Sequence, residues 1–165
     1  MTLPFDPPRP PWRKFLAYDF EVFGTPAPQG SKRHVGNGVM VESSKKVKPW
    51  RADVRDAALA VRNGRDLLDG PLIADMVFTF LRPRGHYRTG RNNHLLRDGV
   101  PPQPCVMPDL SKLVRSTEDA ITKILWTDDA RVVEYGRLAK VYVGSDPDAL
   151  DRPGALIRIY RLENS

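Results

Sequence analysis

The chain has 165 residues, of which 41% are hydrophobic and 28% charged, with 26 Lys and Arg against 20 Asp and Glu for a formal net charge of +6. This composition is typical of a globular domain with a sizeable core and excludes wholesale disorder. No apolar run approaches the roughly 18 residues of a membrane span, and the start lacks the charged and apolar regions of a secretory signal. Because the single cysteine, Cys105, cannot form an internal disulfide, we expect a cytoplasmic protein.

The N-terminal half predicts a tail, two strands and a helix. Residues 1–17 are rich in proline and show little apolar periodicity, so we expect a flexible tail there and one domain over residues 18–165. Large apolar and acidic residues alternate over 18–23, which predicts a half-buried strand. A short strand is expected over 39–41 after a glycine-rich turn, and spacings of three and four over 50–63 predict an amphipathic helix.

The C-terminal half predicts three strands and a second helix. Residues 72–81 are apolar on both faces, which favours a central strand. Residues 82–108 form a long irregular loop rich in glycine and proline, and a helix is expected over 109–123. Further strands are expected over 132–143 and 155–162. Apart from the short strand over 39–41, the order strand, helix, strand, helix, strand, strand indicates one α/β or α+β domain.

Positive charge is concentrated in two loops. Residues 30–51 hold six Lys and Arg against one acid, and residues 82–97 hold five Arg and no acid, so the remainder is net acidic. Arginine-rich loops either keep a protein soluble or bind a phosphate backbone, and charge alone does not choose between the two. The candidate DNA-binding residues in these loops are Lys32, Arg33, Lys45, Lys46, Lys48, Arg82, Arg84, Arg88 and Arg91.

The helix expected over 109–123 has one apolar stripe and one polar stripe. Helical spacing places Ser111, Arg115 and Glu118 together on the polar stripe. Two simpler interpretations compete with a functional one. Asp109 is well suited to an N-cap, and Arg115 with Glu118 to an ordinary surface pair.

Two adjacent acids, Asp128 and Asp129, precede the strand expected over 132–143. Turn formation is the simpler explanation for them. Their mutual repulsion would, however, be relieved by a divalent cation bound between them and Asp109, and hard cations such as Mg²⁺ take oxygen ligands. Such a cation activates water and neutralises an attacked phosphate, while nearby arginines hold the rest of the backbone. An acidic cluster between basic loops is therefore the pattern that a nuclease needs.

Ordered motifs along the chain resemble the RusA family of Holliday junction resolvases, which phages and prophages often encode. They are residues 108–115 (Pro-Asp-Leu-Ser-Lys-Leu-Val-Arg), residues 118–121 (Glu-Asp-Ala-Ile), residues 126–133 (Trp-Thr-Asp-Asp-Ala-Arg-Val-Val) and then Lys140. The Gly-Thr-Pro-Ala-Pro-Gln-Gly segment and the basic residues after it resemble the family's opening strand and first helix. Ordered matches over a whole domain are much harder to obtain by chance than one short motif.

The resemblance implies an α+β fold, with a small mixed sheet packed against two main helices in a single RusA-like domain. It further implies a homodimeric endonuclease that uses Mg²⁺ or Mn²⁺ to cut four-way or branched DNA in a bacterial or phage-infected cell. The family's catalytic, metal-binding carboxylates carry over onto Asp109, Asp128 and Asp129, and its basic catalytic residue onto Arg115. Lys140 is expected to contact the metal site or the DNA.

Two positions depart from the family pattern. Ser111 stands where the family has a carboxylate, which removes one negative charge from the metal site, and Arg115 stands where it has a lysine. Glu118, on the same helical stripe as Ser111, is a hypothetical replacement ligand. An alternative function is therefore a branched-DNA-binding protein with weakened or lost cleavage, and a third is a basic protein whose acids are purely structural.

Overall fold

The computed structural model describes residues 10–30, 32–34, 36–37, 40–42 and 45–165, with the backbone alone for 32–34 and 40–42. The strands and helices are β1 (Trp12–Phe23), β2 (Lys32–His34), β3 (Met40–Glu42), α1 (Val47–Arg62), β4 (Leu72–Phe80), α2 (Leu110–Ile121), β5 (Val132–Tyr142) and β6 (Gly154–Asn164). Three short 3-10 turns are η1 (Arg84–His86), η2 (Gly90–Asn92) and η3 (Asp129–Arg131). Over these residues, no helix is both long and apolar enough to cross a bilayer.

Four strands form one mixed sheet in the order β1-β6-β4-β5. The β4–β5 pair is parallel, and the other two pairs are antiparallel. β4 is central and nearly all of its residues are buried, as its two apolar faces predict. β2 and β3 form a separate hairpin. The α+β expectation is thus confirmed, with one mixed sheet and two main helices.

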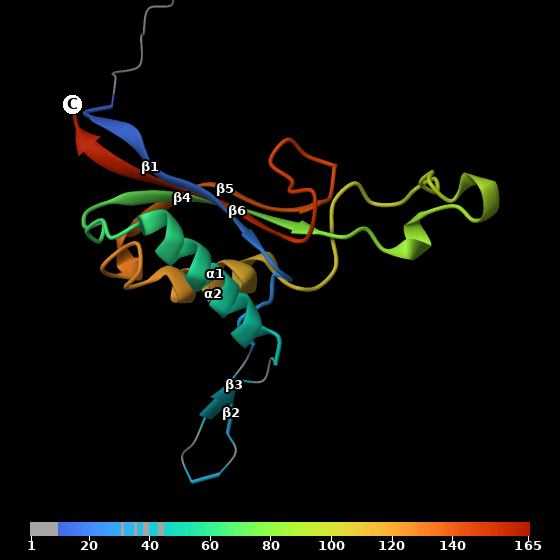
Figure 1. Ribbon diagram of the computed structural model, residues 1–165, viewed down its shortest axis with the longest axis horizontal. Coiled ribbons are helices and arrows are strands. Elements are labelled where there is room, and N and C mark those ends of the chain that lie inside the picture. The colour runs from blue at the N-terminus through green and yellow to red at the C-terminus, as the bar shows by residue number, and fades with distance from the viewer. Residues whose placement is uncertain (1–9, 31, 35, 38–39, 43–44) are drawn as a thin grey trace, which may run out of the picture.

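Both helices cover one face of the sheet (Figure 1). Trp50 of α1 is fully buried against this face, with its ring tilted at 6.4 Å from that of Phe78 in β4. Its indole N–H donates a hydrogen bond of 3.2 Å to the Thr117 hydroxyl of α2 and so ties the two helices together. Because the apolar stripe of α2 faces this core, its polar stripe faces outward.

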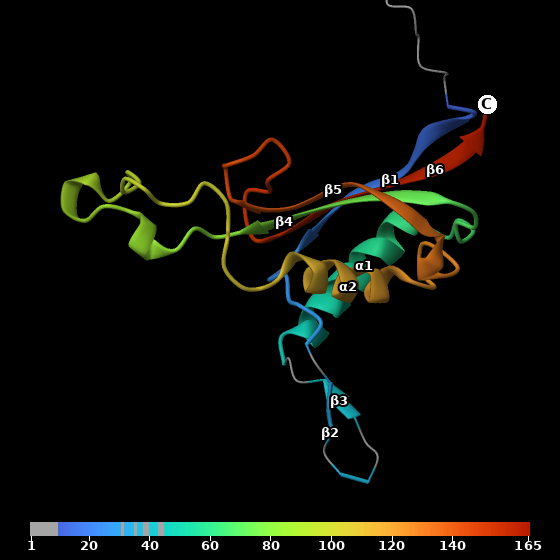
Figure 2. The same cartoon turned by 180° about the vertical axis from the view of Figure 1, so that it is seen from behind.

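The loop between β5 and β6 lies on the opposite face of the sheet (Figure 2). In this loop, which spans residues 143–153 and is called the return loop below, Leu150 packs into a second small core with Val77, Val141 and Leu156. β6 then begins at Gly154, where any Cβ would overlap the Val22 carbonyl oxygen of β1. Close approach of two backbones therefore requires glycine there.

Element ends differ from the sequence predictions where tertiary contacts intervene. β1 begins at Trp12, so residues 12–17 belong to a strand and not to the expected tail, because β6 extends to Asn164 and pairs with Trp12. Residues 1–9 of that tail and Val39 of the predicted short strand lie outside the described residues. α2 ends two residues early, before Lys123, which adopts a left-handed conformation with φ of 69°.

Residues 81–108, called the arm below, extend away from the sheet and the helices in both views (Figures 1 and 2). The arm contains η1 and η2 and is otherwise irregular, as predicted for residues 82–108. Two backbone hydrogen bonds of 2.8 Å, from Arg88 to Leu95 and from Arg97 to His86, close it into an irregular hairpin. The arm ends directly before Asp109 and α2.

Candidate active site

An open groove of about 670 Å³ lies between α2 and β5. Its polar lining comes from Ser111, Arg115 and Glu118 of α2, together with Asp129 of η3 and Tyr135 of β5. The three α2 residues follow one another at spacings of three and four, so they share one face of the helix. The polar stripe predicted from the sequence is therefore confirmed as one wall of a groove.

The segment between α2 and β5 is fixed at two points, and this brings Asp129 beside the helix. The indole N–H of buried Trp126 donates to the Thr122 hydroxyl at 3.0 Å. The Arg131 guanidinium pairs with the Asp69 carboxylate at 2.7 Å. Asp129 is thus held in the turn between these two anchors.

Glu118 is half-buried in the groove and accepts a short hydrogen bond from the Tyr135 hydroxyl. Burial raises the pKa of Glu118, the hydrogen bond from Tyr135 opposes this, and the charge of Asp129 raises the pKa further. Burial also raises the pKa of Tyr135, as does its bond to Glu118, so the phenol stays protonated and donates. Two carboxylates that repel each other in one groove form a site that a cation would stabilise.

Arg115 is exposed on the same wall of the groove. Over the described part of the chain its guanidinium makes no hydrogen bond or ion pair. The interpretation of Arg115 and Glu118 as a surface pair is therefore wrong, because Glu118 is bonded to Tyr135 instead. The guanidinium is free to bind an anion in the groove.

The other two predicted metal ligands lie outside the groove lining. Asp109 occupies the N-cap position of α2, but its carboxylate makes no capping bond and lies 3.5 Å from the Lys112 ammonium. The Asp128 carboxylate accepts a hydrogen bond of 2.8 Å from the Ala130 N–H, which lowers its pKa and caps η3. Among the residues described, no three His, Cys, Asp or Glu side chains converge to hold a metal ion. Asp109, Asp128 and Asp129 as the metal ligands therefore stay a prediction.

Two residues expected to contact DNA are engaged at the base of the arm. The Lys140 ammonium donates to the carbonyl oxygens of Val106 and Pro108, at 2.7 and 2.9 Å. The Arg82 guanidinium donates to the Pro101 carbonyl at 2.8 Å and stacks over the Tyr142 ring at 4.2 Å. Both side chains therefore anchor the arm to the sheet.

The remaining predicted DNA-binding residues lie at two places. Lys45, Lys46 and Lys48 lie at the start of α1, and Arg84, Arg88 and Arg91 lie on the arm. The side chains of Lys32 and Arg33 lie outside the described residues.

Tyr135 is a groove residue that the sequence analysis did not single out. It lies in a strand of alternating residues and carries no motif of its own. Its pairing with Glu118 depends on the packing of β5 beside α2, and no local pattern reveals that contact.

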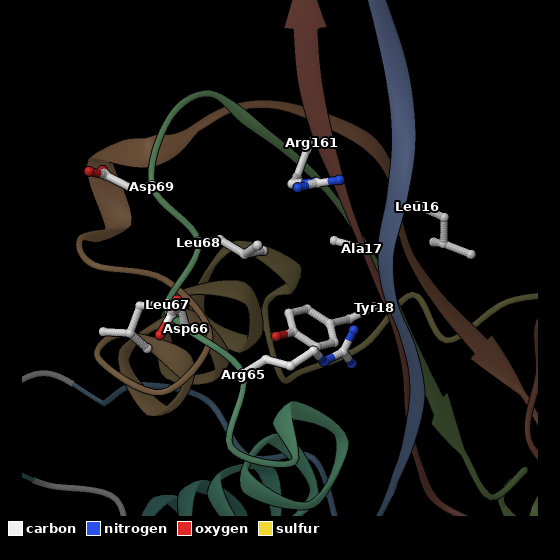
Figure 3. Close-up of a pocket in the computed structure, with 9 residues that line it drawn as sticks. All are labelled: Leu16, Ala17, Tyr18, Arg65, Asp66, Leu67, Leu68, Asp69 and Arg161. Atoms are coloured by element: carbon white, nitrogen blue, oxygen red, sulfur yellow. The ribbon is translucent and has the colours of Figure 1, made fainter.

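A second polar groove, of about 490 Å³, lies between β1, β6 and residues 65–69 (Figure 3). Its Arg65 stacks over the Tyr18 ring at 4.6 Å and donates to the Val61 and Arg62 carbonyls at the end of α1. Its Asp69 is paired with Arg131. Both Arg65 and Asp69 are therefore engaged within the protein.

A scan against family models finds a match to the family described as endodeoxyribonuclease RusA, over residues 23–150. A search of curated proteins gave no match. The matched range contains both helices, the arm and the whole groove beside α2, and it covers well over half of the chain. The chain belongs to the RusA family of endodeoxyribonucleases.

Proposed function

We propose that this protein is a metal-dependent, structure-selective endonuclease that resolves four-way or branched DNA. The family's activity is the cleavage of Holliday junctions, and the observation that supports the finer proposal is the groove beside α2. Its carboxylates Glu118 and Asp129 interact electrostatically, and Arg115 stands unpaired beside them within the described chain. A negative pair for a cation and a free guanidinium for a phosphate are the two components that phosphodiester hydrolysis needs.

The donor chemistry of the groove fits Mg²⁺ or Mn²⁺. All available donors are oxygens, and Mg²⁺ is commonly held by one or two carboxylates with substrate phosphates and water completing its shell. Glu118 and Asp129 would hold the ion, with the Ser111 hydroxyl beside them. When bound, the ion would supply an activated water and neutralise charge on the phosphate. Glu118 would thus replace the carboxylate that the family has at position 111.

The other groove residues position the reacting groups. Arg115 presents a planar pair of donors that suits two oxygens of one phosphate, and it stabilises negative charge as that charge grows. The Tyr135 hydroxyl fixes the orientation of Glu118 through its hydrogen bond. Lys140 holds the backbone that leads into α2 and so acts on the site only through position.

The alternative function is a branched-DNA-binding protein that no longer cleaves. Ser111 favours it, because a hydroxyl is a weaker ligand than a carboxylate and leaves the site one charge short. The two functions differ in one observable, which is nicking of a bound junction when a divalent cation is added.

The test is a nicking assay on a labelled synthetic four-way junction with Mg²⁺ or Mn²⁺. We expect Asp129→Asn and Glu118→Gln each to reduce nicking by more than about 100-fold. Substitution of a residue that only supports a metal ligand already lowers metal affinity or activity by about 10–100-fold, and loss of a ligand should cost more. Asp119→Asn is the matched control, because Asp119 is the neighbouring α2 carboxylate but does not line the groove. It should nick within about threefold of the wild type.

Two results would contradict the proposal. Tight, salt-sensitive junction binding without nicking in either metal would support the alternative. Full activity of Glu118→Gln would exclude Glu118 as a ligand and return Asp109 to that role, which Asp109→Asn would test.

We also infer a homodimer, because resolving a junction requires two symmetric nicks and a two-fold dimer supplies two equivalent sites. The measurement is the molar mass by light scattering, free and bound to a junction. A single chain bound per junction, with only one strand nicked, would contradict the dimer.

A further inference from the structure

We propose that the arm is a DNA-backbone-binding surface, in which Arg84 and Arg91 bind phosphates of a duplex arm outside the cleavage groove. This inference rests on the proposed function for the identity of the substrate as DNA. It adds a binding site that is separate from the groove beside α2 and assigns different roles to the arginines of the arm.

The arm is placed to extend the groove. It leaves the sheet at the end of β4, projects away from the body, and returns to Asp109 at the start of α2 (Figures 1 and 2). Lys140 and Arg82 anchor its two ends to β5 and its neighbours. DNA bound along the arm would therefore be held in a fixed relation to the catalytic groove.

Three of the five arginines in the arm are used to build it. Arg82 donates to the Pro101 carbonyl, Arg88 to the Leu96 carbonyl at 3.2 Å, and Arg97 to the Tyr87 carbonyl at 2.8 Å. These bonds satisfy backbone acceptors in a segment that has no regular ladder of its own. These three side chains therefore have a structural role, whatever else they contact.

The other two arginines are unpaired. Arg84 and Arg91 are exposed, and neither guanidinium makes a hydrogen bond or ion pair with any residue that the structure describes. The arm contains one acid, Asp98, and it lies 3.5 Å from Arg88. The free positive charge of the arm is therefore carried by Arg84 and Arg91, which do not bond to the rest of the arm.

An open hollow of about 560 Å³ lies on the arm beside Arg84, one of its two free arginines. Arg88, Arg97, Asn93 and Tyr87 also line it. All of the charged side chains in this lining are positive, and guanidinium groups suit the paired oxygens of phosphodiesters. A polyanion with regularly spaced phosphates is the ligand that best matches several arginines on one extended segment.

The experiment measures binding without cleavage. A fluorescein-labelled four-way junction is titrated with the full chain in EDTA at several salt concentrations, and anisotropy is recorded. The test variant is the double substitution Arg84→Ala and Arg91→Ala. The charge-matched control is Arg13→Ala and Arg55→Ala, which removes two exposed arginines from β1 and α1.

We expect the arm variant to bind the junction at least about tenfold more weakly at about 100 mM salt. The slope of log K against log salt should be smaller by about 1.8, because each phosphate that the protein no longer neutralises lowers it by about 0.9. Hydroxyl-radical footprints should lose protection at phosphates away from the cut positions. The control should keep the affinity, slope and footprint of the wild type.

An arm variant that matches the control in affinity, slope and footprint would overturn the inference, even if the wild type nicks junctions. Equal losses in the arm variant and the control would also overturn it, because they would reflect net charge alone. Failure of the proposed function would give a different result, because the wild type would then bind DNA through the arm but would not nick it. Absence of any DNA binding by the wild type would refute both.

Discussion

The arm and the return loop both start at the C-terminal ends of neighbouring strands, but the arm extends away from the sheet and the return loop folds back over it. β4 and β5 are parallel and end at the paired residues Phe80 and Tyr142. From there the return loop folds back over the sheet and buries Leu150, whereas the arm extends outward and leaves Leu95 and Leu96 about 40% exposed. A shared starting point therefore does not determine where a loop goes.

The arginines of the two regions also differ in how many carboxylates lie within reach. Arg137 of β5 pairs with Asp146 and Asp148 of the return loop at 2.6 Å, and Arg158 of β6 pairs with Asp148 at 3.0 Å. The arm offers its arginines one fully exposed carboxylate. Beside the return loop, the arginines are held by largely buried carboxylates. In the arm, three arginines are held by backbone carbonyls instead, and Arg84 and Arg91 keep no partner among the described residues. The acceptors that the fold places nearby therefore decide the role of each arginine.

Removal of the apolar anchor of the return loop should have the largest effect. Leu150 is 6% exposed, so Leu150→Ala should lower the free energy of unfolding by about 2–4 kcal/mol. The control is Leu96→Ala in the arm, which should cost less than about 1 kcal/mol because that side chain is already 39% exposed. Urea unfolding followed by tryptophan fluorescence checks both. Equal losses would mean that the arm is as firmly packed as the return loop.

Removal of the central arginine of the return loop should have an intermediate effect. Arg137→Ala leaves two carboxylates without their partner, and we expect a loss of about 1–2 kcal/mol in the free energy of unfolding. The loss is smaller than for a fully buried pair because the Arg137 side chain is 37% exposed. Arg88→Ala in the arm is the control and should change stability by less than about 0.5 kcal/mol. A loss of unfolding free energy in Arg88→Ala as large as that in Arg137→Ala would show that the arginines of the two regions do not differ in structural importance.

The smallest effect should be the change with pH in the stability that the Arg137–Asp146 ion pair contributes. The Arg137 guanidinium lowers the pKa of Asp146 from 3.8 to about 2. The folded pKa lies below the unfolded value, so this pair stabilises the protein above pH 3.8, and the stabilisation is lost as the pH falls toward about 2. Asp146→Asn should therefore be less stable than the wild type at about pH 7, with a difference that narrows below pH 3.8. The expected loss is smaller than for Arg137→Ala, since Arg137 keeps Asp148.

Thermal unfolding of the wild type and Asp146→Asn across this pH range checks the prediction. Asp151→Asn is the control, because its carboxylate is 81% exposed beside Arg152. A gap between wild type and Asp146→Asn that stays constant down to about pH 2 would show that the Asp146 charge does not contribute.

Much of the fold could be predicted because its patterns are local. The alternation over 18–23, the two apolar faces of 72–81 and the helical spacing after Asp109 each reflect neighbours along the chain. Element ends were less accurate, because they depend on partners far away in sequence. β1 extends back to Trp12 only because β6 runs on to Asn164 beside it.

The candidate site was predictable in part. Ser111, Arg115 and Glu118 share a helical face by periodicity alone, and Asp129 was marked by an unusual pair of acids. For Asp128, the simpler prediction of a turn residue is confirmed, because its carboxylate accepts from the Ala130 N–H and caps η3. Lys140 and Arg82 were expected at the DNA, but carbonyl groups of the arm lie within their reach. A positive charge read from sequence does not reveal which acceptors the fold will place beside it.

The sequence by itself determined the family, both helices, the strands of the main sheet and the polar face of α2, since each follows from residue order and spacing along one stretch of chain. Only the tertiary structure decided which charges remain free. Packing of β5 beside α2 brought Tyr135 to Glu118, and folding of the return loop neutralised Arg137. The arm, with a single acid of its own, kept Arg84 and Arg91 unpaired within the described chain. The physical reason is that charges pair through space, and the distances that govern pairing exist only once the chain has folded.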